Sequence, residues 1–539
     1  MGRTSQPVAK SHRTVGAAAK KYGALTVTFF GTYWVLFIAI PLVALLLNVR
    51  FHVGKFFDPS ILSLVKVTAA QASWSTALSG VVGLFLGVAC SRQRRLQLLL
   101  ALPFAISSTV VAYTVMAWFG RKGFLPSFFG IQLPWLFSMK AVVLAHVLLN
   151  APWIGFLVAG AMGEVPRREM EAARTLGAKP AQVGLHIVWS HIVEAWASGL
   201  VQVFALCVMS FAIVLILGGG PPNETLEVSI YTHIRYGALD LGGAVASALW
   251  QLVLTLTPWL LLLFYWNRTG VRQLRRELAP LSLNVSRKFH FWDWIAAGAV
   301  ALFFIPYLWI FIQTESSKSF TEFLFGENTW AEWVPSFQVS LKLALSSAVI
   351  TVAVALSGVV SGILFPRLEK WSAVLLSFPG GVSTLVLALG FWLAYSRWVD
   401  PFEGSWLAIA ILQATVFLPI ALRIFRPIAS AVQFHRIDAA RSLGASPLRA
   451  IRWTEFYRWK GPVFAAFGMA AGVSLGELAA VSFFYSEKLI PLPLLMSRWL
   501  NRYRFDDARG ISILLFLTAT ALVALSTYSG LKPRERRFA

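Results

Sequence analysis

The segment Glu171-Ala-Ala-Arg-Thr-Leu-Gly177 occurs a second time as Asp438-Ala-Ala-Arg-Ser-Leu-Gly444, 267 residues further along the chain. Two pairs of prolines align at the same offset, Pro152 with Pro419 and Pro180 with Pro447. A constant offset over nearly 30 residues indicates a tandem repeat rather than a chance recurrence. We therefore read the chain as two similar halves, each organised around one copy of this segment.

The first copy predicts a short amphipathic helix. Between Pro166 and Leu176 the polar residues recur at helical spacing and leave Met170 and Ala173, together with Leu176, on the opposite face. Pro166 suits the first turn of a helix, and Gly177 suits the left-handed residue that ends one. We expect an element with a defined start and end, one wet face and one apolar face.

The composition predicts a polytopic membrane protein. Of 539 residues, 57% are hydrophobic and 13% charged, and the mean hydropathy is +0.67. The apolar residues lie in runs of about 20, the length that crosses a bilayer core. The net charge of +23 does not indicate nucleic acid, because the basic residues lie between apolar runs and form no patch with interleaved aromatics. Cys90 and Cys207 both lie in apolar runs, so neither disulfides nor a metal cluster is expected.

We predict an all-α chain with about 12 transmembrane helices in two tandem six-helix halves. The expected spans are residues 24–48, 67–91, 97–119, 138–162, 196–217 and 242–266, then 293–313, 337–365, 371–396, 405–425, 461–484 and 508–529. With the N-terminus inside, 32 of the 47 Lys and Arg residues lie on the inner side. The positive-inside rule then places both termini and both repeated helices in the cytoplasm.

These spans divide the chain into five segments. They are a cytoplasmic N-terminal segment (1–23), a first half (24–267), a cytoplasmic linker (268–292), a second half (293–529) and a cytoplasmic tail (530–539). In repeat-built transporters the pathway runs at the interface of the halves. The alternative is a membrane scaffold without a pathway, but a scaffold gives no reason to duplicate a cytoplasmic amphipathic helix.

The repeated segment resembles a family signature. Glu171-Ala-Ala, followed by Gly177 and Ile187, is similar to the EAA motif of binding-protein-dependent ABC importer permeases of the type I fold. In the second copy Asp438 replaces the glutamate, and Trp189-Ser190 and Phe456-Tyr457 stand where the family has Leu-Pro. The resemblance implies that each segment is a coupling helix that docks on a cytoplasmic ATPase subunit. The implied coupling residues are Glu171, Ala172, Ala173, Arg174 and Gly177, with Asp438, Ala439, Ala440, Arg441 and Gly444. The alternative is a pair of helices that only pack on lipid headgroups.

Other stretches narrow the resemblance to fused two-half permeases. Leu217-Gly-Gly-Gly-Pro221, Thr225-Leu-Glu227 and Ile230-Tyr231 resemble permeases for thiamine and, less closely, for ferric iron. The stretches Gly120-Arg-Lys-Gly123 and Leu144-Ala-His-Val147, with Asn150 and Pro152, also resemble the thiamine permease. The resemblance implies thiamine or its phosphates as cargo, with ferric iron as the alternative.

Glu477 is the clearest carboxylate deep within an expected span. Desolvating an ionisable residue is costly, so such a residue is a functional candidate by default. We expect it to face the pathway and to offer a negative site to a cationic substrate, unless a neighbouring helix satisfies it. Ser210 and Phe211 occupy the corresponding part of the first half. Three histidines beside the repeated helices, His186, His191 and His435, are read as interfacial residues rather than ligands.

The sequence contains no enzyme active site that we can identify and no phosphate-cradling Gly-x-x-x-x-Gly-Lys-Ser/Thr motif. ATP hydrolysis would then reside in other chains. The expected partners are two cytoplasmic ABC ATPase subunits, an extracytoplasmic solute-binding protein and the lipid bilayer of a bacterial inner membrane, with no nucleic acid, cofactor or metal. An ion-coupled secondary transporter is the alternative from another class, and an exporter is disfavoured by the short inward loops.

Overall fold

The computed structural model describes residues 17–531 except 49–52, 121–122, 133–134, 219, 221–222, 237–238, 270–290, 313–318, 366, 401, 430–431, 433, 446–448 and 451. The expected linker, most of the N-terminal segment and most of the C-terminal tail lie outside the described residues. Within the described part, the regular elements are helices, apart from one isolated bridge between Ser486 and Leu489. The prediction of an all-α fold is confirmed.

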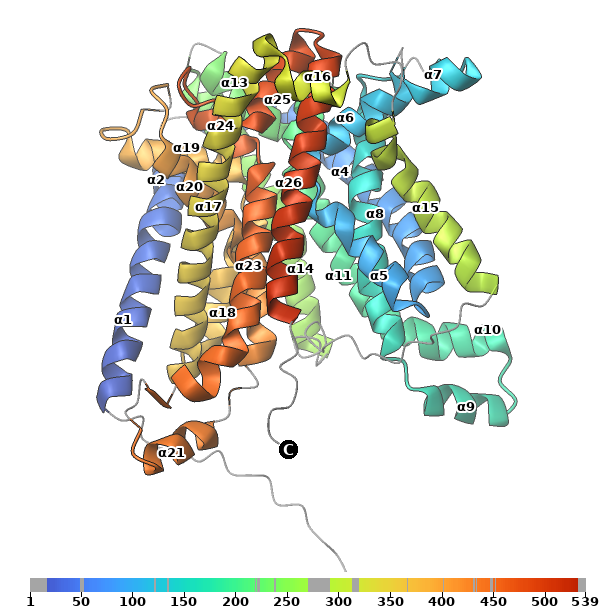
Figure 1. Ribbon diagram of the computed structural model, residues 1–539, viewed down its shortest axis with the longest axis vertical. Helices are drawn as coiled ribbons and strands as arrows, with labels where there is room; N and C mark the ends of the chain where they lie inside the picture. Colours follow the sequence, from blue (N-terminus) through green and yellow to red (C-terminus); the bar gives the residue numbers. More distant parts are fainter. Residues whose placement is uncertain are drawn as a thin grey trace, which may run out of the picture.

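The repeat is visible element by element (Figure 1). Paired helices α8 and α20, α9 and α21, and α12 and α24 each begin 267 residues apart. The first half contains α3 (Val53–Phe56), α4 (Pro59–Cys90), α5 (Arg94–Ala101), α6 (Ser108–Phe119), α7 (Phe124–Phe129), α8 (Met139–Gly163), α9 (Arg167–Thr175), α10 (Pro180–Val183), α11 (Trp189–Val208), α12 (Ala212–Leu217), α13 (Leu226–Arg235) and α14 (Leu241–Thr269). The second half contains α16 (Phe320–Phe325), α17 (Glu327–Leu364), α18 (Glu369–Ser377), α19 (Thr384–Tyr395), α20 (Trp406–Ala429), α21 (Phe434–Ser442), α23 (Tyr457–Leu475), α24 (Ala479–Phe484), α25 (Leu492–Asn501) and α26 (Phe505–Leu531).

The first span of each half packs on the other half. Helix α1 (Ala17–Trp34) continues through a π-helical turn (Val35–Ala39) into α2 (Ile40–Asn48), and these helices pack against α17 and α19. Helix α15 (Phe291–Ile312) packs against α4 and α6. Figure 1 shows α1 and α15 at opposite edges of the molecule. The Tyr33 hydroxyl lies 2.8 Å from Thr415 Oγ1, and Tyr307 donates to the Leu148 carbonyl at 3.0 Å. The two halves are therefore interlocked.

Close helix packing in the first half depends on two glycines spaced four residues apart on α4. A Cβ atom on Gly83 would lie 2.7 Å from the Ala151 carbonyl oxygen of α8. A Cβ atom on Gly87 would lie 2.7 Å from the Gly155 carbonyl oxygen. Small residues at this spacing let backbones approach in a bilayer, where the hydrophobic effect does not drive helices together. The α4 and α8 pair thus forms a rigid support for the elements that follow α8.

Nine helices in the described residues are long and apolar enough to cross a membrane, and a tenth span is formed if the bent pair α18 and α19 is counted as one. The expected single helices over 97–119, 196–217, 371–396 and 461–484 are corrected, because each is broken. In the first case α5 ends and α6 begins at residue 108, and in the third the two parts are bent by 102°. Proline in the turns Leu102–Ala105 and Phe378–Gly381 favours the breaks.

The new helices after two of these breaks are capped by serines. The Ser107 hydroxyl accepts a hydrogen bond from the amide of Thr109 at the start of α6. The Ser383 hydroxyl accepts from the amides of Leu385 and Val386 at the start of α19. Such caps satisfy amides that the first turn leaves unpaired, which is costly to omit in a membrane. The breaks are thus defined features of the sequence.

Candidate coupling helices and translocation site

The two repeated segments form helices that end in the same way. Gly177 and Gly444 both have φ of +85°, so the expectation of a left-handed glycine at each end is confirmed. The amide of Ala178 donates to the Ala173 carbonyl at 2.9 Å, and that of Ala445 donates to the Ala440 carbonyl at 3.1 Å. These bonds close the helix ends and fix the direction in which the chain leaves them.

The end of each helix presents an apolar side chain outward. Leu176 is 88% exposed and Leu443 is 89% exposed. Glu171, Ala172 and Arg174 are also exposed. A groove of about 440 Å³ adjoins the end of α9 and is lined by Ala173, Leu176, Gly177, Ala178, Gln182, Val183, His186 and Ile187. The predicted apolar face is present, and the residue that ends it is not covered by this chain.

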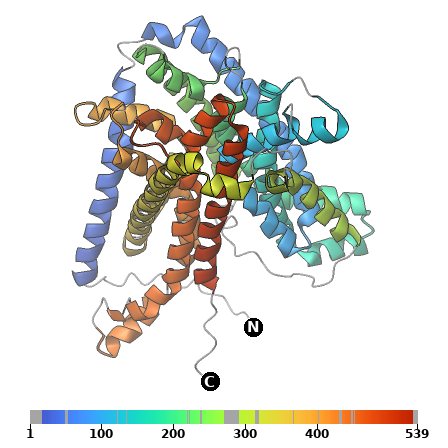
Figure 2. The ribbon, with the colours of Figure 1, turned by 45° about the horizontal axis from the view of Figure 1, so that its top comes forward.

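Helices α9 and α21 lie at the same end of the molecule and on opposite sides of it (Figures 1 and 2). His191 on α11 lies 3.9 Å from Glu169 on α9, so this histidine holds the helix rather than a metal. After each helix the chain enters a π-helical turn, Gly184–Val188 in the first half and Arg452–Phe456 in the second. These turns lie just before or at the positions where the Leu-Pro of the family signature is replaced.

The two predicted pathway residues occupy matching helix breaks. Ser210 lies between α11 and α12, and Glu477 lies between α23 and α24, one repeat later. His146 Nε2 lies 2.8 Å from Ser210 Oγ. The repeat-equivalent residue Gln413 donates to the Glu477 carboxylate at 3.3 Å. The structure therefore brings each predicted residue together with a polar partner on the preceding long helix, and both predicted residues remain partly exposed.

A polar network fixes the orientation of the His146 ring. Gln71 Nε2 lies 2.7 Å from His146 Nδ1, and Ser75 Oγ lies 3.0 Å from the same atom. Because an amide nitrogen can only donate, Nδ1 accepts and Nε2 carries the proton that it donates to Ser210. His146 was quoted above only as part of a family stretch, and its link to Ser210 was not predicted.

The Glu477 carboxylate caps the helix that follows it. It accepts from the amides of Ala479 at 2.8 Å and Ala480 at 3.1 Å, at the positive end of α24. The residue before it, Gly476, accepts a hydrogen bond of 2.9 Å at its carbonyl oxygen from Ser107 of the other half. The break that carries Glu477 therefore lies at the interface between the halves.

A second buried carboxylate, Glu227, was missed. Its side chain is 1% exposed at the start of α13. It accepts from Gln251 on α14 at 2.7 Å and from Ser383 of the other half at 2.5 Å. It lies close enough to Glu477 for the two carboxylates to repel one another. Helix α13 has only ten residues, so no apolar run of spanning length marked Glu227 as an interior residue.

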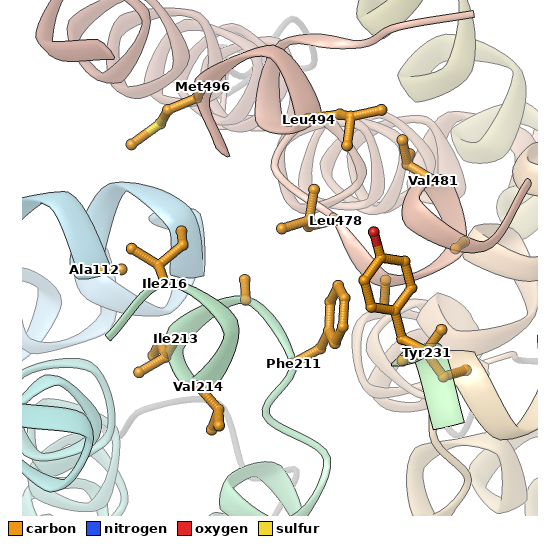
Figure 3. Close-up of a cluster of buried hydrophobic side chains, with 14 of the residues drawn as sticks. Ala112, Phe211, Ile213, Val214, Ile216, Tyr231, Leu478, Val481, Leu494 and Met496 are labelled. Atoms are coloured by element: carbon orange, nitrogen blue, oxygen red, sulfur yellow. The ribbon is translucent and has the colours of Figure 1, made fainter. Parts of the chain in front are cut away.

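An apolar cluster joins the halves around these short helices. Figure 3 shows side chains from α6, α12 and α13 of the first half facing side chains at α24 and α25 of the second. The labelled members are buried in one continuous core: Ala112, Phe211, Ile213, Val214, Ile216, Tyr231, Leu478, Val481, Leu494 and Met496. In Figure 1, α13, α24 and α25 lie at the end of the molecule opposite α9 and α21. The halves are packed together at that end.

The geometry agrees with comparisons to known proteins. Residues 354–537 match the family described as binding-protein-dependent transport system inner membrane component. The chain belongs to this permease family. Both repeats lie in one chain, so the permease is a fused two-half permease of an ABC importer. Members of this family are multi-pass inner-membrane transport subunits that work with ATPase and binding-protein partners.

Similar proteins match the permease along most of its length. The thiamine transport system permease protein of Brucella abortus is 25% identical over 503 residues, which cover 90% of this chain and 91% of that protein. The corresponding protein of Salmonella typhimurium is 26% identical, covering 87% and 89%. That of Haemophilus influenzae is 26% identical, covering 88% and 90%. The matches include both halves, so the tandem architecture is shared with these proteins.

Proposed function

We propose that this permease forms the translocation pathway of an ABC importer for thiamine, delivered by an extracytoplasmic binding protein. The observation that carries the proposal is the match to thiamine permeases over both halves of the chain. The sequence stretches around Leu217 and Leu144 support the same substrate class. Separate ATPase subunits supply the energy, and both termini lie in the cytoplasm.

Helices α9 and α21 are the docking points for the two ATPase subunits in this proposal. Their closed ends and exposed leucines support it, because a rigid helix with an uncovered apolar residue can transmit a rigid-body movement between proteins. The two helices lie far apart at one end of the molecule (Figure 2). Each can therefore engage a separate ATPase subunit.

Substrate passes between the halves, along the matched breaks that carry Ser210 and Glu477. The break residues remain partly exposed although they lie deep in the fold. In repeat-built transporters, broken helices at the interface of the halves form the substrate path. Glu477 supplies negative charge to that path, as expected for a cationic cargo.

The experiment that tests this function is import by purified components. The permease is co-expressed with its neighbouring ATPase and binding protein, the complex is placed in proteoliposomes, and uptake of radiolabelled thiamine is measured with and without internal ATP. ATP-dependent thiamine uptake is the expected result. An iron-loaded binding protein in the complex would instead assign ferric iron as cargo, and uptake driven by an ion gradient without any ATPase would assign a secondary transporter.

A further inference from the structure

Two carboxylates from opposite halves meet at the centre of the permease, and nearby basic side chains do not balance them. Glu227 is bonded to Ser383 and Gln251, and Glu477 to Gln413 and two backbone amides. Neither carboxylate forms an ion pair with any residue in the described part of the chain. All the groups that contact them are neutral.

Such an arrangement is incomplete by itself. An isolated carboxylate loses its hydration when it is buried, and neutral donors recover only part of that free energy. Two carboxylates within repulsive range add an unfavourable interaction between the halves. A positive charge placed between them would compensate both. The site therefore has the charge of a cation receptor.

A second observation points to a missing ligand. Gln251 is fully buried, and its amide nitrogen donates both to Glu227 and to the Val208 carbonyl. The oxygen of the same amide has no hydrogen-bond partner. Its position beside Glu227 adds an unused acceptor to the two carboxylates. A ligand that fits this set of groups is positively charged and carries hydrogen-bond donors.

The two carboxylates differ in how they are covered. Glu477 is partly exposed at its helix break, whereas Glu227 is covered by Ser383 of the other half. Separation of the halves at this end breaks the Ser383 bond and leaves the Glu227 carboxylate free to accept another donor. Alternating access therefore exchanges a hydrogen bond within the protein for a bond to cargo.

We propose that Glu227 and Glu477 form one binding site, shared by the two halves, for an organic cation that carries amino donors and no phosphate group. The proposal rests on the thiamine function above and narrows it. Thiamine has a permanently charged thiazolium ring and an aminopyrimidine, which match the carboxylates and the free amide oxygen. A phosphate ester would bring negative charge toward both carboxylates, so the site selects free thiamine over its phosphates.

The test uses the full complex in proteoliposomes with binding protein loaded with radiolabelled thiamine. Glu227→Gln and Glu477→Gln should each lower uptake by about tenfold or more, the effect of losing one modest ionic contact. ATP hydrolysis stimulated by the loaded binding protein should stay near the parent rate, because neither residue lies on α9 or α21. Glu227→Asp should restore part of the uptake. Glu327→Gln, at an exposed position in the first turn of α17, is the matched control.

Ser383→Ala separates a binding role from a structural one. It leaves both carboxylates in place and removes the bond that joins Glu227 to the other half. The binding proposal predicts that uptake is kept or raised in this variant. Uptake lost in Ser383→Ala to the same extent as in Glu227→Gln would overturn the proposal, as would parental uptake in Glu227→Gln, and Ser383→Ala alone decides if Glu227→Gln does not assemble. If the parent complex takes up no thiamine, it is the proposed function that fails.

Discussion

Ser107 of the first half donates a hydrogen bond of 2.9 Å to the carbonyl oxygen of Gly476 in the second. A Cβ atom on Gly476 would lie 2.3 Å from the Ser107 Cβ atom. The two backbones therefore touch at the residue next to Glu477, and only glycine fits there. This contact places the two halves at their closest where the helix break carries the predicted pathway carboxylate.

Gly476→Ala should push the halves apart at this point. Overpacking of this kind typically costs about 1–3 kcal/mol, and here the cost falls on the interface rather than on either half. We expect normal membrane abundance, a lower melting temperature of the purified permease and impaired uptake. The double variant Ser107→Gly with Gly476→Ala removes the clashing Cβ atom and should recover much of the loss. Equal defects in the single and double variants would contradict this explanation.

Valine at Gly177 or Gly444 should uncouple the permease from its ATPase subunits. At φ of +85° a residue with a Cβ atom is strained by about 1–2 kcal/mol, more if it is β-branched, so the helix end is redirected. The membrane spans are untouched, and abundance should stay normal while copurified ATPase and uptake fall. Gly184→Val is the control, since Gly184 has right-handed backbone angles and open space around it. A similar loss in the control would show that any bulk near α9 is harmful.

Charge reversal at Glu171 or Asp438 should weaken ATPase association through the interface. Glu171 is exposed on α9, and its replacement by Lys leaves the fold of the permease unchanged. A misplaced charge at a docking surface slows association and disfavours the bound state. Copurified ATPase should fall in Glu171→Lys and in Asp438→Lys, and the loss should depend on ionic strength. If both variants and both glycine variants transport like the parent, α9 and α21 are interfacial helices and not coupling helices.

Arg235 should hold the outer ends of the halves together. Its guanidinium donates to the carbonyl oxygens of Phe483 at 2.6 Å and Tyr485 at 3.0 Å, at the end of α24, and lies 4.2 Å from the Tyr485 ring centre. Arg235→Ala should lower the melting temperature and raise ATP hydrolysis in the absence of binding protein, because charged hydrogen bonds contribute about 1.5–3 kcal/mol each. Arg502, one repeat later and exposed, is the matched control. Unchanged basal hydrolysis in Arg235→Ala would argue against this role.

His146→Gln should be tolerated and His146→Leu should not. Glutamine is the residue that the second half has at the equivalent position, and it can both accept from Gln71 and donate to Ser210. Leucine leaves Gln71, Ser75 and Ser210 without that partner, at a cost of about 1–3 kcal/mol for each unsatisfied group. Thermal unfolding of the purified permease should separate the two variants clearly. Equal melting temperatures would show that the ring contributes only its volume.

The repeat, the membrane class and the docking helices could be predicted because they depend on local patterns. Gly177 and Gly444 follow amphipathic segments whose spacing is fixed by the helix itself, and the left-handed backbone of both glycines is confirmed. The helix breaks were not predicted. The stretch 461–484 is apolar throughout, and the pause at Gly476 follows from a contact with Ser107, which lies 369 residues away.

The sequence by itself therefore determined the number of halves, their helical character and the identity of the cytoplasmic segments, because these follow from hydropathy and from residue spacing within one helix. Tertiary structure alone decided that α1 and α15 pack on the opposite halves, that His146 supports Ser210, and that Glu227 lies beside Glu477. Glu227 is an ordinary acidic residue in a short polar stretch until α13 is packed between α14 and α19. Burial and the charge of its surroundings, which give the carboxylate its role, are properties of the assembled halves and not of the local sequence.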